Sequence, residues 1–152
     1  MPAATPRDIA ETFYEAFAAR DGKAMGALYA DDATFEDPVF GRLDAAHTRI
    51  MWRLLVGRAA DLAVSYTVET ADETTARVAW IAEYTFSQTD RPVVNNVTGT
   101  LTCRDGLIIR HKDVFSFWHW SRQALGLPGL LLGWTPFLQA KVGAKARKTI
   151  GL

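Results

Sequence analysis

The hydrophobic pattern of this chain changes its period once, at residue 62, and this change sets the fold class. Before it, apolar residues recur at helical spacing, as Ile9, Phe13 and Phe17 do. After it, apolar and polar residues alternate along segments that reach about residue 117, which is typical of strands with one buried face. Helices followed by a meander of long strands predict an α+β domain, in which an antiparallel sheet curves around the helices.

Capping and turn residues mark the predicted element boundaries. Thr5 caps a first helix that ends near Ala19, a second short helix stops at a turn formed by Asp31 and Asp32, and Asp44 caps a third helix that ends at Gly57. The Asp-Gly pair at 105–106 predicts the last hairpin turn. The four predicted strands cover residues 62–69, 74–88, 92–103 and 107–117.

Length and composition bound the domain organisation and the partners. A chain of 152 residues that is 49% hydrophobic fits one domain over 1–152, with residues 118–152 as a C-terminal helical extension. Seventeen basic and seventeen acidic residues cancel, which argues against a nucleic-acid surface and favours a neutral or apolar ligand. No Walker sequence or strand-linked glycine-rich loop supports a nucleotide, so we expect no cofactor.

Cysteine usage and apolar runs bear on the compartment. Cys103 is the only cysteine, so no internal disulfide forms, and residues 1–8 lack the apolar core of a signal peptide. We therefore expect a cytoplasmic protein. The longest apolar run of the tail, 130–132, is far shorter than the roughly 20 residues of a spanning helix, so no transmembrane segment is predicted.

One carboxylate stands out in the segment Tyr29–Gly41. Asp37 precedes a proline, which disfavours a helical conformation and predicts an extended residue held at a bend. With alternating side chains, Ala33, Phe35 and Asp37 share one face, so the carboxylate points where an aromatic ring points. Asp37 is therefore a candidate catalytic base, although a plain Asp-Pro turn residue explains it about as well.

The segment Tyr-Ala-Asp-Asp-Ala-Thr-Phe-Glu-Asp-Pro at 29–38 resembles the ketosteroid isomerases. More broadly, the chain is similar to the nuclear transport factor 2-like (NTF2-like, or cystatin-like) superfamily, which includes the SnoaL-like polyketide cyclases and limonene-epoxide hydrolases. The resemblance implies a cone-shaped fold and an acid-base enzyme. It puts His111, Asp113 and Phe115 in the pocket, with Asp113 where the cyclases carry their catalytic aspartate.

The strand alternation reaches the same two polar residues independently. His111 and Asp113 lie two positions apart on the face that also carries Phe115, about 7 Å apart at Cα, which makes them a candidate proton-transfer pair. A satisfied structural pair inside the core is the alternative. The three histidines of the chain have no recognised ligand spacing, so no metal site is expected.

The resemblance also has gaps. The isomerases' oxyanion tyrosine falls on Phe13, one residue from Tyr14, which a helix rotates by about 100 degrees. Their second oxyanion donor falls near Gly99, which has no side chain. Other side chains expected to line an apolar pocket, each of which is as readily explained as ordinary core or strand packing, are Tyr14, Phe35, Trp52, Trp80, Tyr84, Asn95, Phe115 and Trp118.

These observations predict a small enzyme that acts on an apolar carbonyl or epoxide compound by cofactor-independent acid-base catalysis. Asp37 or Asp113 would be the base, and His111 would orient or donate a proton. The rivals are a non-catalytic domain that binds an apolar ligand and a dimerisation module of the same fold. We expect a homodimer formed through the outer sheet face. The apolar tail after Phe117 predicts a covered pocket, a partner surface or a membrane-surface contact.

Overall fold

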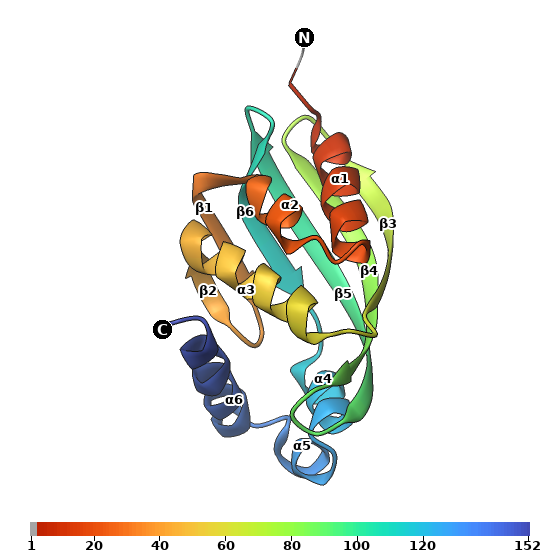
Figure 1. Cartoon of the computed structure of the whole chain (residues 1–152), viewed down its shortest axis with the longest axis vertical. Helices are drawn as coiled ribbons and strands as arrows, with labels where there is room; N and C mark the ends of the chain where they lie inside the picture. Colours follow the sequence, from red (N-terminus) through yellow and green to blue (C-terminus); the bar gives the residue numbers. More distant parts are fainter. Residues whose placement is uncertain (1–2) are drawn as a thin grey trace.

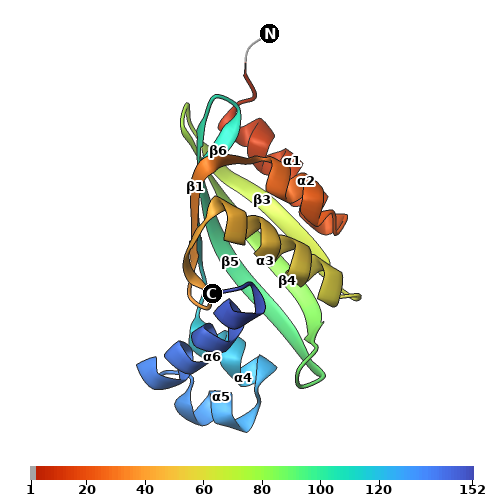
Figure 2. The ribbon, with the colours of Figure 1, turned by 60° about the vertical axis from the view of Figure 1, so that its left-hand side comes forward.

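Six strands form one curved, unclosed sheet, and three helices from the first part of the chain lie against its concave face (Figures 1 and 2). The structure is a computed structural model that describes residues 3–152. The α+β class predicted from the change of period is confirmed. The elements are α1 Pro6–Ala18, α2 Gly22–Ala27, β1 Tyr29–Asp37, β2 Gly41–Asp44, α3 Ala45–Arg58, β3 Ala63–Ala71, β4 Thr75–Phe86, β5 Arg91–Arg104, β6 Leu107–Val114, α4 Phe117–Ala124, α5 Leu127–Leu132 and α6 Pro136–Thr149.

The sheet has the order β2-β1-β6-β5-β4-β3, and one of its strand pairs is parallel. Strands β3 to β6 form the predicted antiparallel meander, and β1 joins it by pairing parallel to β6. The turn expected at Asp31 and Asp32 is wrong, because α2 ends at Ala27 and both aspartates lie inside β1. Pairing with β2 and β6 extends this segment, and a register shift between Tyr29 and Thr34 accommodates the exposed aspartates.

Capping side chains fix two of the covering helices as expected. Thr5 and Asp8 form a capping box at the start of α1, and the Asp44 side chain accepts the His47 backbone N–H at the start of α3. The helical spacing of α3 predicts an apolar face of Ile50, Met51, Leu54 and Leu55, and only part of this face is buried. Met51 and its neighbours Trp52 and Val56 are buried, whereas Ile50 and Leu55 are 39% and 38% exposed. Helical spacing alone allows either set of apolar residues to face inward. The set that contains Trp52 is buried because it is the one in contact with the sheet.

The outer face of the sheet carries apolar side chains among polar ones. Val114, Val94 and Ile81 are 54%, 45% and 37% exposed. Strand alternation predicts Ile108 on this outer face together with Val94 and Val114. That prediction is wrong for Ile108, which is fully buried because the β5–β6 register shifts between Thr102 and Cys103. Association of two chains through this face stays a prediction.

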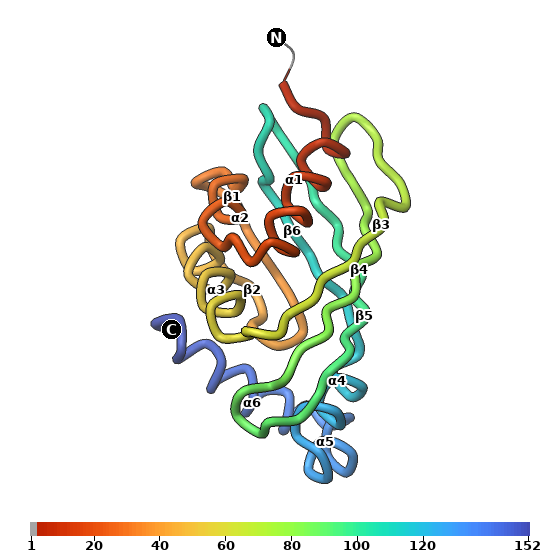
Figure 3. Tube along the Cα trace, turned by 45° about the vertical axis from the view of Figure 1, so that its right-hand side comes forward, coloured from red at the N-terminus to blue at the C-terminus, as the bar shows by residue number. Residues whose placement is uncertain are grey.

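Three helices follow the sheet and gather at the end of the molecule opposite the N-terminus (Figures 1 and 3). They fill the segment that was expected to form the helical extension. Within residues 3–152, no helix combines the length and the apolar character needed to cross a membrane.

Candidate functional site

The parallel pairing of β1 with β6 places two carboxylates side by side. Phe35 lies opposite His111 and Glu36 opposite Lys112, so the next position of this register sets Asp37 beside Asp113. Neighbouring strands are about 4.8 Å apart. Two residues that are 76 positions apart in the chain therefore meet at one end of the same strand pair, on the concave side of the sheet.

Asp37 is both a turn residue and a carboxylate in a water-poor site. Its Oδ1 accepts the backbone N–H groups of Val39 at 2.8 Å and of Phe40 at 2.6 Å, which closes the hairpin between β1 and β2. The pKa of Asp37 is raised to about 7, mainly by burial. The N–H donors of Phe40 and Val39 lower this pKa, and the charge of Asp113 raises it. Asp37 is therefore a turn residue of this hairpin, and its role as a catalytic base stays a prediction.

A chain of hydrogen bonds links Trp52, Tyr29 and His111 to Asp113, the second carboxylate. The Trp52 indole N–H donates to the Tyr29 hydroxyl at 2.9 Å, and this hydroxyl lies 2.7 Å from Nδ1 of His111. Nε2 of His111 lies 2.9 Å from Oδ1 of Asp113, which the Trp80 indole N–H approaches at 3.4 Å. The His111 side chain is fully enclosed by the rings of Phe13, Tyr29, Phe35 and Trp52.

The donors of this chain assign the tautomer of the histidine. Because Trp52 donates to the Tyr29 oxygen, the single hydroxyl hydrogen of Tyr29 is left for Nδ1 of His111. Nδ1 is then an acceptor, and Nε2 carries the hydrogen that is donated to Asp113. The imidazole in this arrangement holds Asp113 in place and satisfies its Oδ1, and the hydrogen bonds of the described residues leave the second oxygen of Asp113 free.

We expect His111 to be an Nε2–H imidazole at neutral pH, which nitrogen-detected NMR of histidine-labelled protein measures. Tyr29→Phe removes the donor to Nδ1 and the acceptor of the Trp52 N–H, so we expect loss of this tautomer preference and about 1–3 kcal/mol of stability. His119, which is exposed, serves as an internal reference. An Nδ1–H form of His111 in the wild-type protein would contradict the assignment.

Tyr14 occupies the space above Gly99. The hydroxyl of Tyr14 is fully buried and, alone among the buried side-chain polar atoms of residues 3–152, has no hydrogen-bond partner. A Cβ atom built on Gly99 would lie 2.5 Å from this hydroxyl and 2.9 Å from Oδ1 of Asp113. The position where the isomerases carry a second donor therefore has no room for a side chain.

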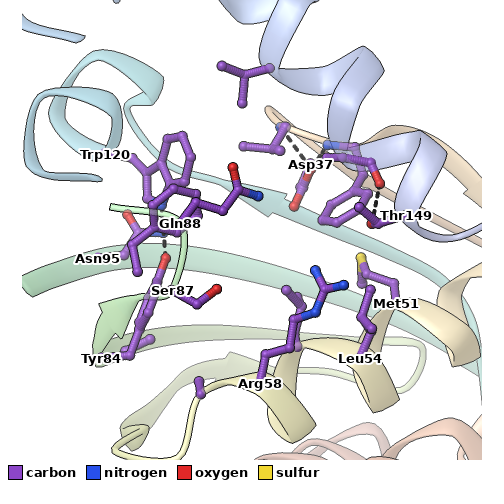
Figure 4. A pocket seen from close by; sticks show the side chains of 18 of the residues that line it. Asp37, Met51, Leu54, Arg58, Tyr84, Ser87, Gln88, Asn95, Trp120 and Thr149 are labelled. Atoms are coloured by element: carbon purple, nitrogen blue, oxygen red, sulfur yellow. Dashed lines mark hydrogen bonds between the residues drawn. The ribbon is translucent and has the colours of Figure 1, made fainter. Parts of the chain in front are cut away.

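A cavity of about 370 Å³ opens beside the two carboxylates. Figure 4 shows Asp37 on one side of it, Tyr84 and Trp120 on the opposite side, and Arg58 reaching in from α3. Its walls are mostly apolar and come from every layer of the fold. They include Phe17, Phe40, Met51, Trp52, Leu54, Trp80, Ala82, Tyr84, Phe115, Trp120, Leu138, Val142 and Ala146, and the polar side chains Asp37, Arg58, Gln88, Asn95, Asp113, Lys141 and Lys145.

Tyr84 presents a hydroxyl to this cavity. The Trp120 indole N–H donates to the Tyr84 oxygen at 2.9 Å, and within the described part of the chain the Tyr84 hydrogen has no acceptor. Burial raises the pKa of Tyr84, and the Trp120 hydrogen bond lowers it by a smaller amount. Tyr84 is therefore a neutral donor whose hydrogen is available to a ligand.

The model of the SnoaL-like domain family matches residues 10–111, which is more than half of the chain. The chain belongs to the SnoaL-like domain family. This SnoaL-like protein has no match among curated proteins. The match ends within β6, so α4, α5 and α6 lie beyond it.

Solved structures share the fold of this SnoaL-like protein at low sequence identity. A protein of ketosteroid isomerase-like fold from Catenulispora acidiphila, in complex with trimethylamine, has a TM-score of 0.70 at 20% identity, covering 88% of this chain and all of that one. IdmH of Streptomyces antibioticus, proposed to be a polyketide cyclase, has 0.67 at 21%, covering 82% and 100%. An LEH-like epoxide hydrolase of M. tuberculosis has 0.60 at 22%, covering 82% and 92%.

The predicted site residues of this SnoaL-like protein differ in where they lie relative to the cavity. Asp37, Asp113 and most of the expected pocket residues line the cavity, and His111 lies directly behind Asp113. Tyr14 and Phe35 are buried outside the cavity lining. The expected lining residues that reach the cavity are Trp52, Trp80, Tyr84, Asn95 and Phe115.

Trp118 lies away from the cavity of the SnoaL-like protein. Its indole N–H donates to the Leu130 carbonyl at 3.2 Å, and the guanidinium of Arg122 covers its ring. Trp120 takes the pocket position instead, because both tryptophans lie in α4, where two positions rotate the side chain by about 200 degrees and put the indoles on opposite sides of the helix. Sequence reasoning also missed the hydroxyl of Tyr29, although this residue opens the segment singled out for its Asp-Pro pair.

Metal ligands do not gather in this site. Across residues 3–152, no three histidine, cysteine, aspartate or glutamate side chains lie close enough together to hold an ion.

Proposed function

We propose that this SnoaL-like protein is an enzyme that acts on an apolar carbonyl or epoxide compound by general acid-base catalysis. The observation that carries the proposal is the meeting of two carboxylates, half-buried Asp37 and buried Asp113, in one apolar cavity with an available hydroxyl donor, Tyr84. Relatives of the same fold that are named as a polyketide cyclase and an epoxide hydrolase support this class of substrate.

Asp37 is the proposed proton carrier. A base works best when its pKa lies near the working pH, and burial brings the pKa of Asp37 to about 7. Near neutral pH this carboxyl takes a proton from a carbon next to a carbonyl, or from a water that attacks an epoxide, and returns it to the product. The two backbone N–H groups at Oδ1 hold it in place and leave Oδ2 for the substrate.

Asp113 and His111 are the proposed positioning pair. The Nε2–H group of His111 fixes one oxygen of Asp113, and the aspartate charge in turn keeps the pKa of Asp37 high. The network therefore sets the chemistry of Asp37, while His111 itself is enclosed by aromatic rings.

Tyr84 is the proposed electrophile. The isomerase-like chemistry needs a donor to the oxygen on which negative charge develops, and Tyr14 is buried outside the cavity. The Tyr84 hydroxyl lies in the cavity, with Trp120 orienting it. This arrangement gives a carbonyl or epoxide oxygen a neutral donor on the wall opposite Asp37 (Figure 4).

The test is exchange and hydrolysis with simple apolar probes. An apolar cyclic ketone in D₂O reports proton abstraction as deuterium uptake by NMR, and a terpenoid epoxide reports hydrolysis. Asp37→Asn is expected to lose at least about 100-fold in kcat/KM on the probe that reacts, and Tyr84→Phe about 10- to 100-fold. Asp105→Asn removes an exposed carboxylate in a hairpin turn outside the cavity lining, and is expected to keep wild-type activity.

Two outcomes would count against catalysis. Equal rates for the wild-type protein and Asp37→Asn on both probes would show that Asp37 is only a turn residue. Tight displacement of a fluorescent apolar dye by these probes without turnover would instead favour the rival function, a binding domain for an apolar ligand, which the same cavity also accommodates.

A further inference from the structure

Six large apolar side chains stand exposed on one short stretch of the tail. They lie in α5 and in the turn into α6, at the end of the molecule opposite the N-terminus (Figures 1 and 2). Single exposed apolar residues are ordinary, but a contiguous group marks an interaction surface. The members of this apolar cluster are Leu127 at 64% exposure, Leu130 at 47%, Leu131 at 59%, Leu132 at 46%, Trp134 at 73% and Phe137 at 71%.

Glycines explain why the leucines face outward. Gly129 packs directly on the Ser121 carbonyl of α4, and Gly133 packs on the Ser121 hydroxyl, so neither position has room for a Cβ atom. The side of α5 that touches the protein is therefore made of glycine, and the opposite side carries the leucines. This is the reverse of an ordinary surface helix, whose apolar side faces the core. The packing of α5 on α4 therefore keeps the apolar cluster exposed.

The charged side chains of the tail are all basic. Five of the seventeen basic residues and none of the seventeen acidic residues follow position 113, so the tail carries +5 and residues 1–113 carry −5. Phe137, Lys141, Lys145 and Lys148 recur at helical spacing, and all four are exposed on one face of α6. The cations therefore continue the surface that the apolar cluster begins.

We propose that α5 and the first turn of α6 bind the surface of a lipid bilayer that contains anionic lipids. The leucines, Trp134 and Phe137 enter the boundary between headgroups and acyl chains, and the lysines of α6 meet the negatively charged headgroups. A second copy of this chain fits the surface less well, because a symmetric contact would bring two tails of +5 together.

Binding in this orientation also determines how the cavity lies relative to the bilayer. Lys141 and Lys145, which belong to the basic face, line the cavity next to Leu138 and Val142. The proposed orientation therefore sets the α6 wall of the cavity on the side that faces the bilayer. The lipid contact itself is independent of the proposed catalysis, and each is tested without the other.

The experiment is cosedimentation of the full chain with vesicles of phosphatidylcholine mixed with phosphatidylglycerol, and with vesicles of phosphatidylcholine alone. We expect binding to the mixed vesicles that weakens as salt is raised. Trp134→Ala with Phe137→Ala is expected to lower the partition coefficient at least about tenfold, and Lys148→Gln about fivefold. Ile50→Ser with Leu107→Ser removes two exposed apolar side chains that lie outside α5, α6 and the cavity lining, and should leave binding unchanged.

Thermal unfolding checks that each variant is folded, which is expected because every substituted side chain is exposed. Failure of the folded wild-type protein to sediment with the mixed vesicles would overturn the proposal. Binding that survives loss of Trp134 and Phe137 would do the same. Self-association without vesicles that the same double variant abolishes would assign the surface to a second copy of the chain instead.

Discussion

Replacing Asp37 with asparagine is expected to raise the free energy of unfolding at pH 8 by on the order of 4 kcal/mol, with almost no change near pH 3. Burial holds the pKa of this carboxyl at about 7 in the folded protein, against an ordinary value of 3.8. Between these two values the unfolded chain releases the proton and the folded chain keeps it, so the wild-type protein loses stability as pH rises and levels off above pH 7. Asparagine does not ionise, so the variant does not lose this stability as pH rises.

The variant keeps the turn, because the amide oxygen of asparagine accepts the same N–H groups of Val39 and Phe40. Urea unfolding at pH 4 and pH 8 measures the difference. Asp72→Asn is a control of opposite sign, because the N–H groups of Thr74 and Thr75 lower the pKa of Asp72 and its carboxylate stabilises the fold above that pKa. A gain for Asp37→Asn that does not depend on pH would exclude ionisation as its cause.

Gly99→Ala is expected to lower the free energy of unfolding by about 3 kcal/mol. The new methyl group would lie 2.5 Å from the Tyr14 hydroxyl, in a core that has no space to move it, and crowding of this kind costs about 1–3 kcal/mol. Tyr14→Phe alone should be neutral or stabilising by up to about 1 kcal/mol, because it removes a buried hydroxyl that has no partner.

The double variant decides whether these two positions interact. With the hydroxyl gone, Gly99→Ala should cost only about 1 kcal/mol, which leaves a coupling energy of about 2 kcal/mol in the double-mutant cycle. Chemical denaturation of the four proteins at one pH supplies the cycle. Additive effects would mean that the methyl group meets Asp113 and not Tyr14, since Oδ1 of Asp113 is the next nearest atom at 2.9 Å.

Local rules predicted most of the elements. Thr5 and Asp44 bear side chains that cap a helix wherever one begins, and the Asp-Gly pair at 105–106 adopts the positive φ angles that a tight hairpin needs. The alternation predicted along 75–86 is present in β4, because the buried side chains of this strand all lie on the concave face of the sheet, where the helices pack. These features depend on residues that are close together in the sequence, so the sequence alone predicts them.

The candidate site depends on contacts that no local rule contains. Nothing near Asp37 or Asp113 in the sequence says that their strands pair in parallel, and an antiparallel pair with the same residues would separate the two carboxylates. The hydroxyl of Tyr29 was missed for the same reason, because its partner His111 lies 82 residues away. Trp118 was taken for a lining residue because a rotation of about 200 degrees along the helix decides between it and Trp120, and helix boundaries are the least certain part of a sequence interpretation.

The tail of the chain also holds the hairpin that carries Asp37. Gln139 of α6 donates to the Pro38 carbonyl at 2.8 Å, and Arg147 donates to the Phe40 carbonyl at 2.7 Å. Between them, Gly143 packs against the Val39 carbonyl so closely that a Cβ atom would clash with it. The N–H groups of Val39 and Phe40, which fix the carboxylate, belong to the same three residues. α6 therefore holds in place the hairpin that carries the proposed base, and because Leu138, Val142 and Ala146 of the same helix line the cavity, a displacement of α6 changes the direction of the carboxylate and the shape of the cavity together.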